Sequence, residues 1–163
     1  MARKKKHKGS GNAQEVQNAA KTLFANIRFQ SVDNPIRSVL VTSTVPNEGK
    51  TTVALSLAIA AGRSGNKVLL MEGDMRRRSM RAVIDARPRY GLHALLTKRC
   101  SLEAALTETG FDNVWFIDAE AGIPNPDGLL NSRMLADLIE QLVGQFDYII
   151  ADTPPVTAPV PRS

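Results

Sequence analysis

Residues 37–57, RSVLVTSTVPNEGKTTVALSL, constrain the fold more than any other part of the chain. They open with an apolar run at residues 39–41, Val-Leu-Val, of the kind that forms a buried parallel strand. A polar turn follows, and from Thr51 apolar residues recur at helical spacing as far as Gly62 and Gly65. A strand, a glycine-containing turn and a helix that opens with Gly-Lys-Thr are typical of a phosphate-binding loop.

Such a loop binds phosphate through its backbone and through two side chains. The first N–H groups of a helix have no partner within the helix, and the helix dipole adds positive potential there. In this pattern Lys50 contacts the β- and γ-phosphates of a nucleotide, and the Thr51 hydroxyl binds Mg²⁺. Thr44 stands where the pattern has its first glycine, and the alternative is a chance loop before an amphipathic helix. The predicted nucleotide-binding residues are Val45, Pro46, Asn47, Glu48, Gly49, Lys50, Thr51 and Thr52.

Two further apolar strands end in carboxylates. Residues 68–71 lead directly into Glu72-Gly73-Asp74, and residues 148–151 lead into Asp152. Side chains two residues apart at the end of a strand point to the same side of a sheet, and ligands bind at the carboxyl edge of doubly wound sheets. Asp152 fits the Walker B arrangement, in which an acid helps to hold Mg²⁺. An ordinary polar strand exit is the alternative, but the upstream phosphate-binding loop favours a functional role.

The rest of the chain alternates between helical and strand patterns. Apolar spacing predicts a helix over residues 13–29, which Asp33-Asn34-Pro35 ends before the first strand. The remaining patterns predict short helices at 91–98 and 101–107, a strand at 114–117, a rigid loop at 122–126 and a helix at 133–143. This alternation predicts an α/β fold: a doubly wound, mostly parallel sheet with helices on both faces, like that of P-loop NTPases.

Positive charge is concentrated at the amino terminus. The 163 residues include 21 basic and 16 acidic side chains, which gives a net charge of +5. Five basic residues lie within residues 3–8 and no acid does, so the rest of the chain is balanced. We therefore predict a disordered basic tail over residues 1–12 and one P-loop domain over residues 13–163. The tail is interpreted as a solvated arm, with anionic lipid or nucleic acid as alternative contacts.

Other chemistries are poorly supported. Cys100 is the single cysteine, and His7 and His93 are the only histidines, which disfavours a disulfide scaffold, a zinc cluster and a cysteine–histidine catalytic pair. An arginine cluster after the Glu72-Gly73-Asp74 segment is by default a solvated face, although guanidinium groups beside a phosphate site also suit anions or an acidic partner. It comprises Arg76, Arg77, Arg78, Arg81, Arg87 and Arg89.

Three segments, VTSTVPNEGKTT, VLLMEGDMRR and FDYIIADTPP, together resemble the bacterial tyrosine kinases (BY-kinases) of capsule and exopolysaccharide synthesis. The likeness extends to NIRFQSVDNPIRSVLVTS and PNPDGLLNSRML and covers residues 21–156. The resemblance implies ATP and Mg²⁺ as cofactors and tyrosine-containing proteins, the kinase itself included, as substrates. It implies Lys50, Glu72, Asp74 and Asp152 as catalytic residues, with Thr51, Asp74 and Asp152 at the metal. Glu72 stands where the family usually has an aspartate, proposed to take the proton from the substrate tyrosine.

The same resemblance implies a partner and a location. The partner is a membrane adaptor of the chain-length-determinant type, so the chain is expected in the cytoplasm, at the inner face of the membrane through that adaptor. No nucleic-acid partner is expected. The family's oligomerisation helix carries a glutamate and two arginines at three-residue spacing, where this chain has Asn18, Lys21 and Phe24. Asn47 replaces a usual glycine of the loop.

Family domains continue beyond the Walker B strand and end in a tyrosine cluster. This chain contains only Tyr90 and Tyr148, so we expect a truncated domain that lacks the last strands. Residues 39–41 would then lie at an edge of the sheet. Tyr148 is expected to be buried in its strand, which leaves Tyr90 as the acceptor for self-phosphorylation.

Two alternatives from other functional classes remain open. A partitioning or cell-division ATPase of the same superfamily would act as a switch, but those proteins carry an additional lysine early in the loop, where this chain has Val45-Pro46-Asn47. The other alternative is a non-catalytic remnant that binds nucleotide or only its adaptor. A phosphotransfer assay with and without the adaptor segment separates these alternatives.

Overall fold

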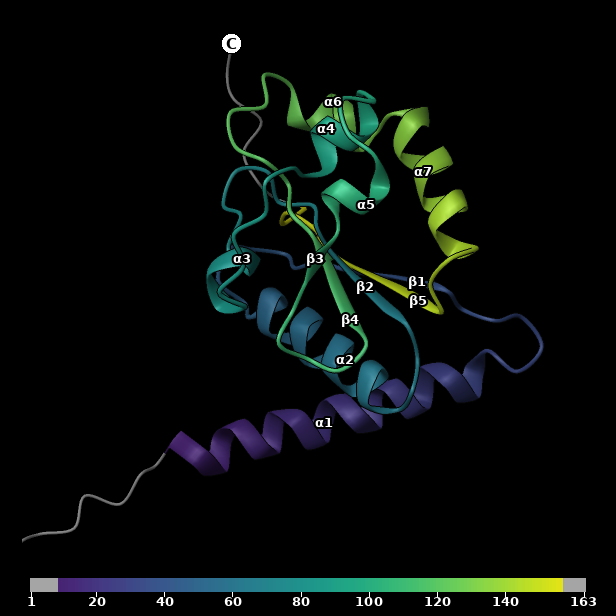
Figure 1. Cartoon of the computed structure of the whole chain (residues 1–163). Helices are drawn as coiled ribbons and strands as arrows, with labels where there is room; N and C mark the ends of the chain where they lie inside the picture. The colour runs from purple at the N-terminus through teal and green to yellow at the C-terminus, as the bar shows by residue number, and fades with distance from the viewer. Residues whose placement is uncertain (1–8, 157–163) are drawn as a thin grey trace, which may run out of the picture.

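The computed structural model describes residues 9–156, which alternate between helices and strands. In chain order the elements are α1 (Gly9–Gln30), β1 (Ser38–Val41), α2 (Lys50–Arg63), β2 (Val68–Glu72), α3 (Met80–Val83), α4 (Leu92–Leu96), α5 (Leu102–Ala105), β3 (Thr107–Glu108), β4 (Val114–Ile117), α6 (Pro126–Leu130), α7 (Arg133–Val143) and β5 (Tyr148–Asp152). Five strands form one sheet in the order β1-β5-β2-β4-β3. Figure 1 shows α1 and α2 below this sheet and α4 to α7 above it.

The sheet is parallel except at one edge. β1, β5, β2 and β4 pair in parallel, and only the two-residue strand β3 runs antiparallel, against β4. The register places Glu72 of β2 directly beside Asp152 of β5, and Asp152 beside Val41 of β1. These carboxyl ends meet at one edge of the sheet, at the end where α2 begins. The predicted doubly wound, mostly parallel α/β fold is confirmed, and at least within residues 9–156 β1 is an edge strand.

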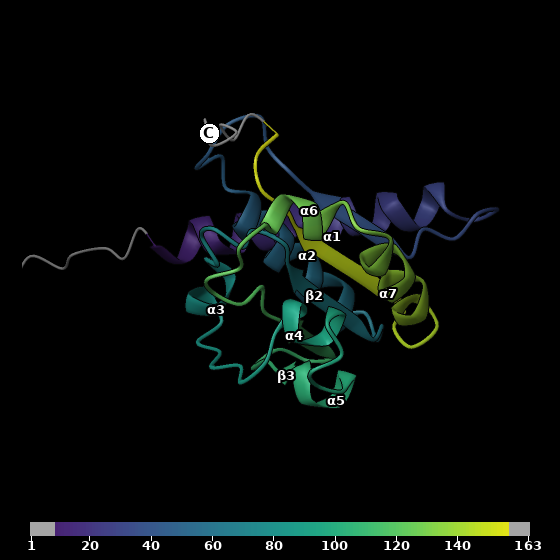
Figure 2. The same cartoon turned by 90° about the horizontal axis from the view of Figure 1, so that it is seen from above.

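Two apolar cores, one on each face, follow from the alternation of side chains along the strands. Leu70 of β2 and Ile150 of β5 belong to the core between the sheet and α2, together with Phe24 of α1. Leu69 of β2 and Ile149 of β5 belong to the core between the other face of the sheet and helices α4 and α7. Figure 2 shows the second set of helices from above, on the side of the sheet away from α2. Both faces of β2 are buried, which explains its unbroken apolar sequence.

Three short elements were not expected from the sequence, and several boundaries differ. The predicted helices at 91–98 and 101–107 are the shorter α4 and α5, and Thr107 begins β3 instead. Helix α1 begins at Gly9, so residues 9–12, which the sequence assigned to the tail, form its first turn, while residues 1–8 lie outside the described range. Helix α6 begins inside the predicted rigid loop, because the Asn125 side chain accepts the Gly128 N–H at 3.1 Å and Pro126 suits a first helical position. Helix α3 and strand β3 are too short to show periodicity.

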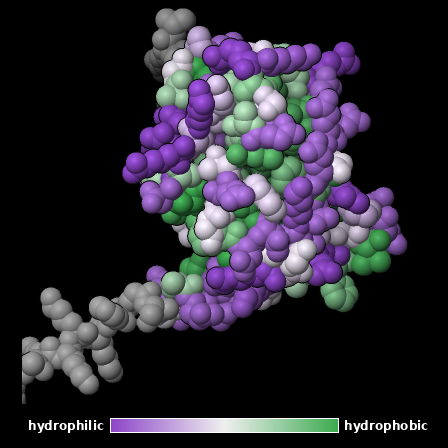
Figure 3. Space-filling model, in the orientation of Figure 1, coloured by the Kyte–Doolittle hydropathy of each residue, from purple (hydrophilic) through white to green (hydrophobic). Residues whose placement is uncertain are grey.

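The first turns of helix α1, in purple, reach beyond the body of the molecule (Figure 1). Its ring contact with the core is the pair Phe24 and Tyr148, whose centroids lie 5.1 Å apart in an edge-to-face arrangement. Tyr148 is therefore half-buried rather than fully buried, because it begins β5 at the margin of the sheet. Phe29 and Val32 are exposed where the chain leaves α1, and Figure 3 shows apolar side chains at that end. No helix within residues 9–156 is long and apolar enough to cross a membrane.

Candidate functional site

The loop between β1 and α2 has the backbone conformation that its sequence requires. Gly49 has a φ of 82° and Asn47 a φ of 65°, both in the left-handed region that glycine, and next asparagine, tolerates. Asn47 can therefore replace the usual glycine at its position. The Glu48 carboxylate closes the loop by accepting the Thr44 N–H at 2.9 Å and the Val45 N–H at 3.4 Å.

Lys50 and Thr51, the first residues of α2, lie against two of the predicted acids. Lys50 Nζ lies 3.5 Å from Asp74 Oδ2 and 3.3 Å from Asp152 Oδ1. The Thr51 hydroxyl donates to Asp152 Oδ2 at 2.6 Å. All four side chains lie at the carboxyl edge of the sheet, as the sequence predicted from the ends of three parallel strands.

Glu72 is fully buried, and its carboxylate accepts backbone hydrogen bonds from both ends of the loop that follows β2. One carboxylate oxygen accepts the Asp74 N–H at 3.0 Å, and the other accepts the Met80 N–H at 2.9 Å. The pKa of Glu72 is raised to about 7, chiefly by burial; the neighbouring Asp152 and Asp74 carboxylates also raise it, and the two N–H donors oppose the rise. Glu72 thus determines the path of residues 74–80.

The residues of this loop make several contacts that the sequence did not reveal. Asp74 Oδ1 accepts the backbone N–H groups of Arg76 and Arg77, each at 3.2 Å. Ser79 Oγ lies 3.1 Å from Thr51 Oγ1, next to the predicted metal ligands. The sequence gives no signal for this contact between a loop hydroxyl and a helix hydroxyl, because the loop carries no periodic pattern.

Asp118 is a further acid at the carboxyl edge. It directly follows β4, is 2% exposed and forms an ion pair with Arg78. The same rule that identified Asp74 and Asp152, an acid just after an apolar strand, would have found it. One arginine of the predicted cluster is therefore used inside the protein. Another, Arg89, lies with its guanidinium 5.4 Å from the centre of the Tyr90 ring.

The donor atoms at this edge suit magnesium. Asp74, Asp152 and Thr51 offer hard oxygen atoms, and Mg²⁺ uses one or two carboxylates together with phosphate and water oxygens. Within residues 9–156 no group of three histidine, cysteine, aspartate or glutamate side chains is placed to hold a metal by itself. The arrangement fits a metal that arrives with a phosphate ligand.

Some predicted residues have no part in this cluster of side chains. Val45 and Thr52 are exposed, and within residues 9–156 neither side chain forms a hydrogen bond or ion pair with Lys50 or the acids. The contribution expected of them, a backbone N–H directed at phosphate, stays a prediction.

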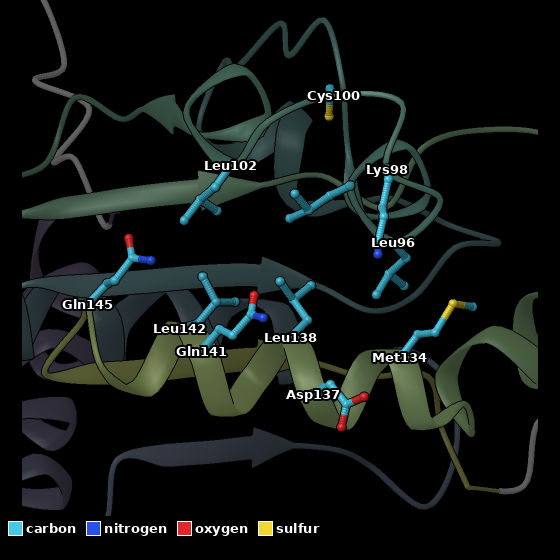
Figure 4. A pocket seen from close by; sticks show the side chains of 11 residues that line it. Leu96, Lys98, Cys100, Leu102, Met134, Asp137, Leu138, Gln141, Leu142 and Gln145 are labelled. Carbon is cyan, nitrogen blue, oxygen red and sulfur yellow. The ribbon is translucent and has the colours of Figure 1, made fainter.

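A separate cavity of 490 Å³ lies between α7 and the α4–α5 region (Figure 4). Leucines form its floor, and Lys98, Cys100, Asp137 and Gln141 are among the polar residues that line it. Burial, and secondarily the Glu120 carboxylate, raise the pKa of the Cys100 thiol, which disfavours a thiolate nucleophile. None of the predicted site residues lines this cavity.

The fold and the carboxyl-edge cluster define a P-loop nucleotide-binding domain. The chain matches the AAA domain family over residues 15–160, nearly its whole length, and belongs to that family. Its relatives within this family include bacterial tyrosine kinases. It is 37% identical to the tyrosine-protein kinase CpsD of Streptococcus pneumoniae over 145 residues, which are 88% of this chain and 62% of that protein.

Solved structures agree with this relationship. The kinase domain of the Escherichia coli tyrosine kinase ETK is similar with a TM-score of 0.82 and 26% identity, over 88% of this chain and 56% of that one. The septum site-determining protein MinD of Pyrococcus horikoshii, solved with Mg-ADP, has a TM-score of 0.64 and 30% identity, over 73% of this chain and 49% of that one. The chain thus spans less than two thirds of each of these proteins.

Proposed function

We propose that this chain is the ATP-binding, phosphate-transferring part of a bacterial protein-tyrosine kinase that regulates capsular or exopolysaccharide synthesis and export. The observation that carries the proposal is the placement of Lys50 against both Asp74 and Asp152, with Thr51 bonded to Asp152. One cation, one hydroxyl and two carboxylates at the start of a helix match the needs of a magnesium nucleotide. The likeness to CpsD and ETK supplies the tyrosine as acceptor.

Each residue then has a chemical role. Lys50 contacts phosphate oxygens, while Thr51, Asp74 and Asp152 hold the metal, which when bound neutralises charge on the transferring phosphate. Glu72 accepts the proton of the tyrosine hydroxyl, and a pKa of about 7 suits a base that works near neutral pH. Because Glu72 is fully buried and held by backbone N–H groups of Asp74 and Met80, contact with a substrate requires residues 74–80 to shift.

The partner we propose is the cytoplasmic end of a membrane adaptor of the chain-length-determinant type, which places the chain at the inner face of the membrane. Several copies would assemble there. The support is the family resemblance.

A MinD-like ATPase switch is the second candidate, favoured by the likeness to that solved structure. Two observations weigh against it: the TM-score is lower than that for ETK, and the loop has no lysine among Val45-Pro46-Asn47.

A phosphotransfer assay separates the candidates. The chain is incubated with ATP, Mg²⁺ and a tyrosine-containing adaptor segment, and both phosphotyrosine and free phosphate are measured. The proposal predicts phosphotyrosine that falls on the order of a hundredfold in Asp152→Asn and is unchanged in Asp137→Asn, an exposed acid of α7. Free phosphate without phosphotyrosine would favour the switch, and nucleotide binding without either product would favour a non-catalytic remnant.

A further inference from the structure

Arg77 brings a second cationic group to the phosphate-binding loop. Its guanidinium Nη1 donates to Asn47 Oδ1 at 2.6 Å, although the two residues are 30 positions apart in the chain. Asn47 lies in the loop with a φ of 65°, three residues before Lys50. Both side chains are exposed, so the guanidinium lies at the open side of the loop rather than in the core.

A hydrogen bond to the Asp74 carboxylate holds the backbone of Arg77 in place. Its N–H donates to Asp74 Oδ1 at 3.2 Å, while the other oxygen of the same carboxylate lies 3.5 Å from Lys50 Nζ. Glu72 anchors both ends of the loop that carries Arg77. Lys50 Nζ and the backbone N–H of Arg77 therefore contact the two oxygens of one carboxylate, which places the Arg77 backbone beside the lysine.

Charge at the site favours such a movement. Lys50 faces two carboxylates, so its single positive charge is already compensated before any phosphate arrives. Among the described residues, the Arg77 guanidinium bonds only the neutral amide oxygen of Asn47. A guanidinium bonds a phosphate more strongly than an amide, because the bond is charge-assisted and bidentate. Two other arginines of the cluster are occupied, Arg78 by Asp118 and Arg89 over the Tyr90 ring.

We propose that Arg77 is a phosphate-binding residue that exchanges Asn47 for the terminal phosphate of a nucleoside triphosphate and so makes the site selective for the triphosphate over the diphosphate. The proposal rests on the proposed function, since it requires a nucleotide in the loop. Asn47 acts as the resting partner that keeps the guanidinium beside the loop.

Titration calorimetry with ATP and with ADP, each with Mg²⁺, tests the proposal on the 163-residue chain. Arg77→Met should weaken ATP binding at least about tenfold while changing ADP binding less than about threefold. Arg77→Lys should restore only part of the loss, because lysine lacks the planar fork.

Arg81→Met is the matched control. Arg81 is exposed on the same segment, and its side chain makes no hydrogen bond to the loop among the described residues, so its loss should leave the ATP-to-ADP preference intact. Equal weakening of ATP and ADP in Arg77→Met, or no weakening of either, would overturn the inference alone. A wild-type chain that binds neither nucleotide would overturn the proposed function, and this inference with it.

Discussion

Three carboxylates, Glu72, Asp74 and Asp152, lie close together at the carboxyl ends of two neighbouring strands, and one lysine forms ion pairs with only two of them. Within residues 9–156, Glu72 is the one of the three that pairs with no cation. It is fully buried, and its pKa of about 7 lies well above the ordinary value of 4.5. Folding therefore favours its protonated form.

This shift predicts a pH dependence of stability. The folded state holds the Glu72 proton up to about pH 7, whereas the unfolded chain releases it near pH 4.5. The free energy of unfolding should therefore fall as pH rises between these values, by roughly 3 kcal/mol from this group alone. Urea unfolding without metal at pH 5 and pH 8 measures it.

Glu72→Gln is the control for this prediction, because an amide does not titrate. As pH rises, the free energy of unfolding of the wild type should fall relative to that of Glu72→Gln. A difference that stays constant from pH 5 to pH 8 would show that Glu72 has an ordinary pKa.

At the scale of elements, α2 has to lie close to the sheet so that the loop before it meets the ends of β2 and β5. Gly62 permits this approach at the other end of the helix. A Cβ atom at that position would lie 2.2 Å from the Asp112 carbonyl oxygen and 2.8 Å from Val114 Cγ2. The absence of a side chain there allows α2 to pack against the turn before β4.

We predict that Gly62→Ala destabilises the protein by about 1–3 kcal/mol, because backbone has to move to admit the methyl group. Gly11→Ala in α1 is the matched comparison, since nothing lies within 4 Å of a Cβ atom there, and alanine should be neutral or stabilise by up to about 1 kcal/mol. Chemical denaturation measures both. Equal effects of the two substitutions would mean that the close packing of α2 is not significant.

At the scale of the whole molecule, β1 is the most exposed part of the sheet. It pairs only with β5 within residues 9–156, and Leu40 in its middle is 67% exposed. An edge strand with an exposed apolar side chain is a template for pairing with another chain. The predicted phosphate-binding loop begins where this strand ends.

We predict that Leu40→Lys lowers the rate of aggregation of the isolated chain several-fold, because a charged edge resists strand pairing. Light scattering at a fixed concentration and temperature measures the rate. Leu23→Lys removes a leucine that is 42% exposed on α1, away from any strand edge, and should have a smaller effect. If both substitutions slow aggregation equally, general hydrophobicity rather than the edge of β1 is the cause.

The sequence predicted the parts of the fold that follow from local patterns. Apolar runs in the sequence located β1, β2, β4 and β5. Because parallel strands share a carboxyl edge, the sequence also predicted that Lys50, Thr51, Asp74 and Asp152 lie close together, as they do. The catalytic and metal-binding roles of these residues stay predictions.

The rest depends on the path of residues 73–80. Neither the Glu72 contacts with Asp74 and Met80 nor the Arg77 contact with Asn47 is encoded in a periodic pattern. Short elements such as α3 were not predicted for the same reason, since four residues show no periodicity. Tyr148 was expected to be buried but is half-buried, because burial at a strand's first residue depends on what the neighbouring helix covers.

The most direct test of the account is the binding of ATP to the wild-type chain and to Lys50→Met, measured by calorimetry with and without Mg²⁺. Lys50 Nζ contacts Asp74 and Asp152 at the start of α2, so its loss should remove most ATP affinity while the far-UV spectrum stays that of the wild type. Lys21→Met, an exposed lysine of α1, should bind ATP normally, and Mg²⁺ should strengthen binding in both Lys21→Met and the wild type. Unchanged ATP affinity in Lys50→Met would contradict the assignment of this loop as the nucleotide site.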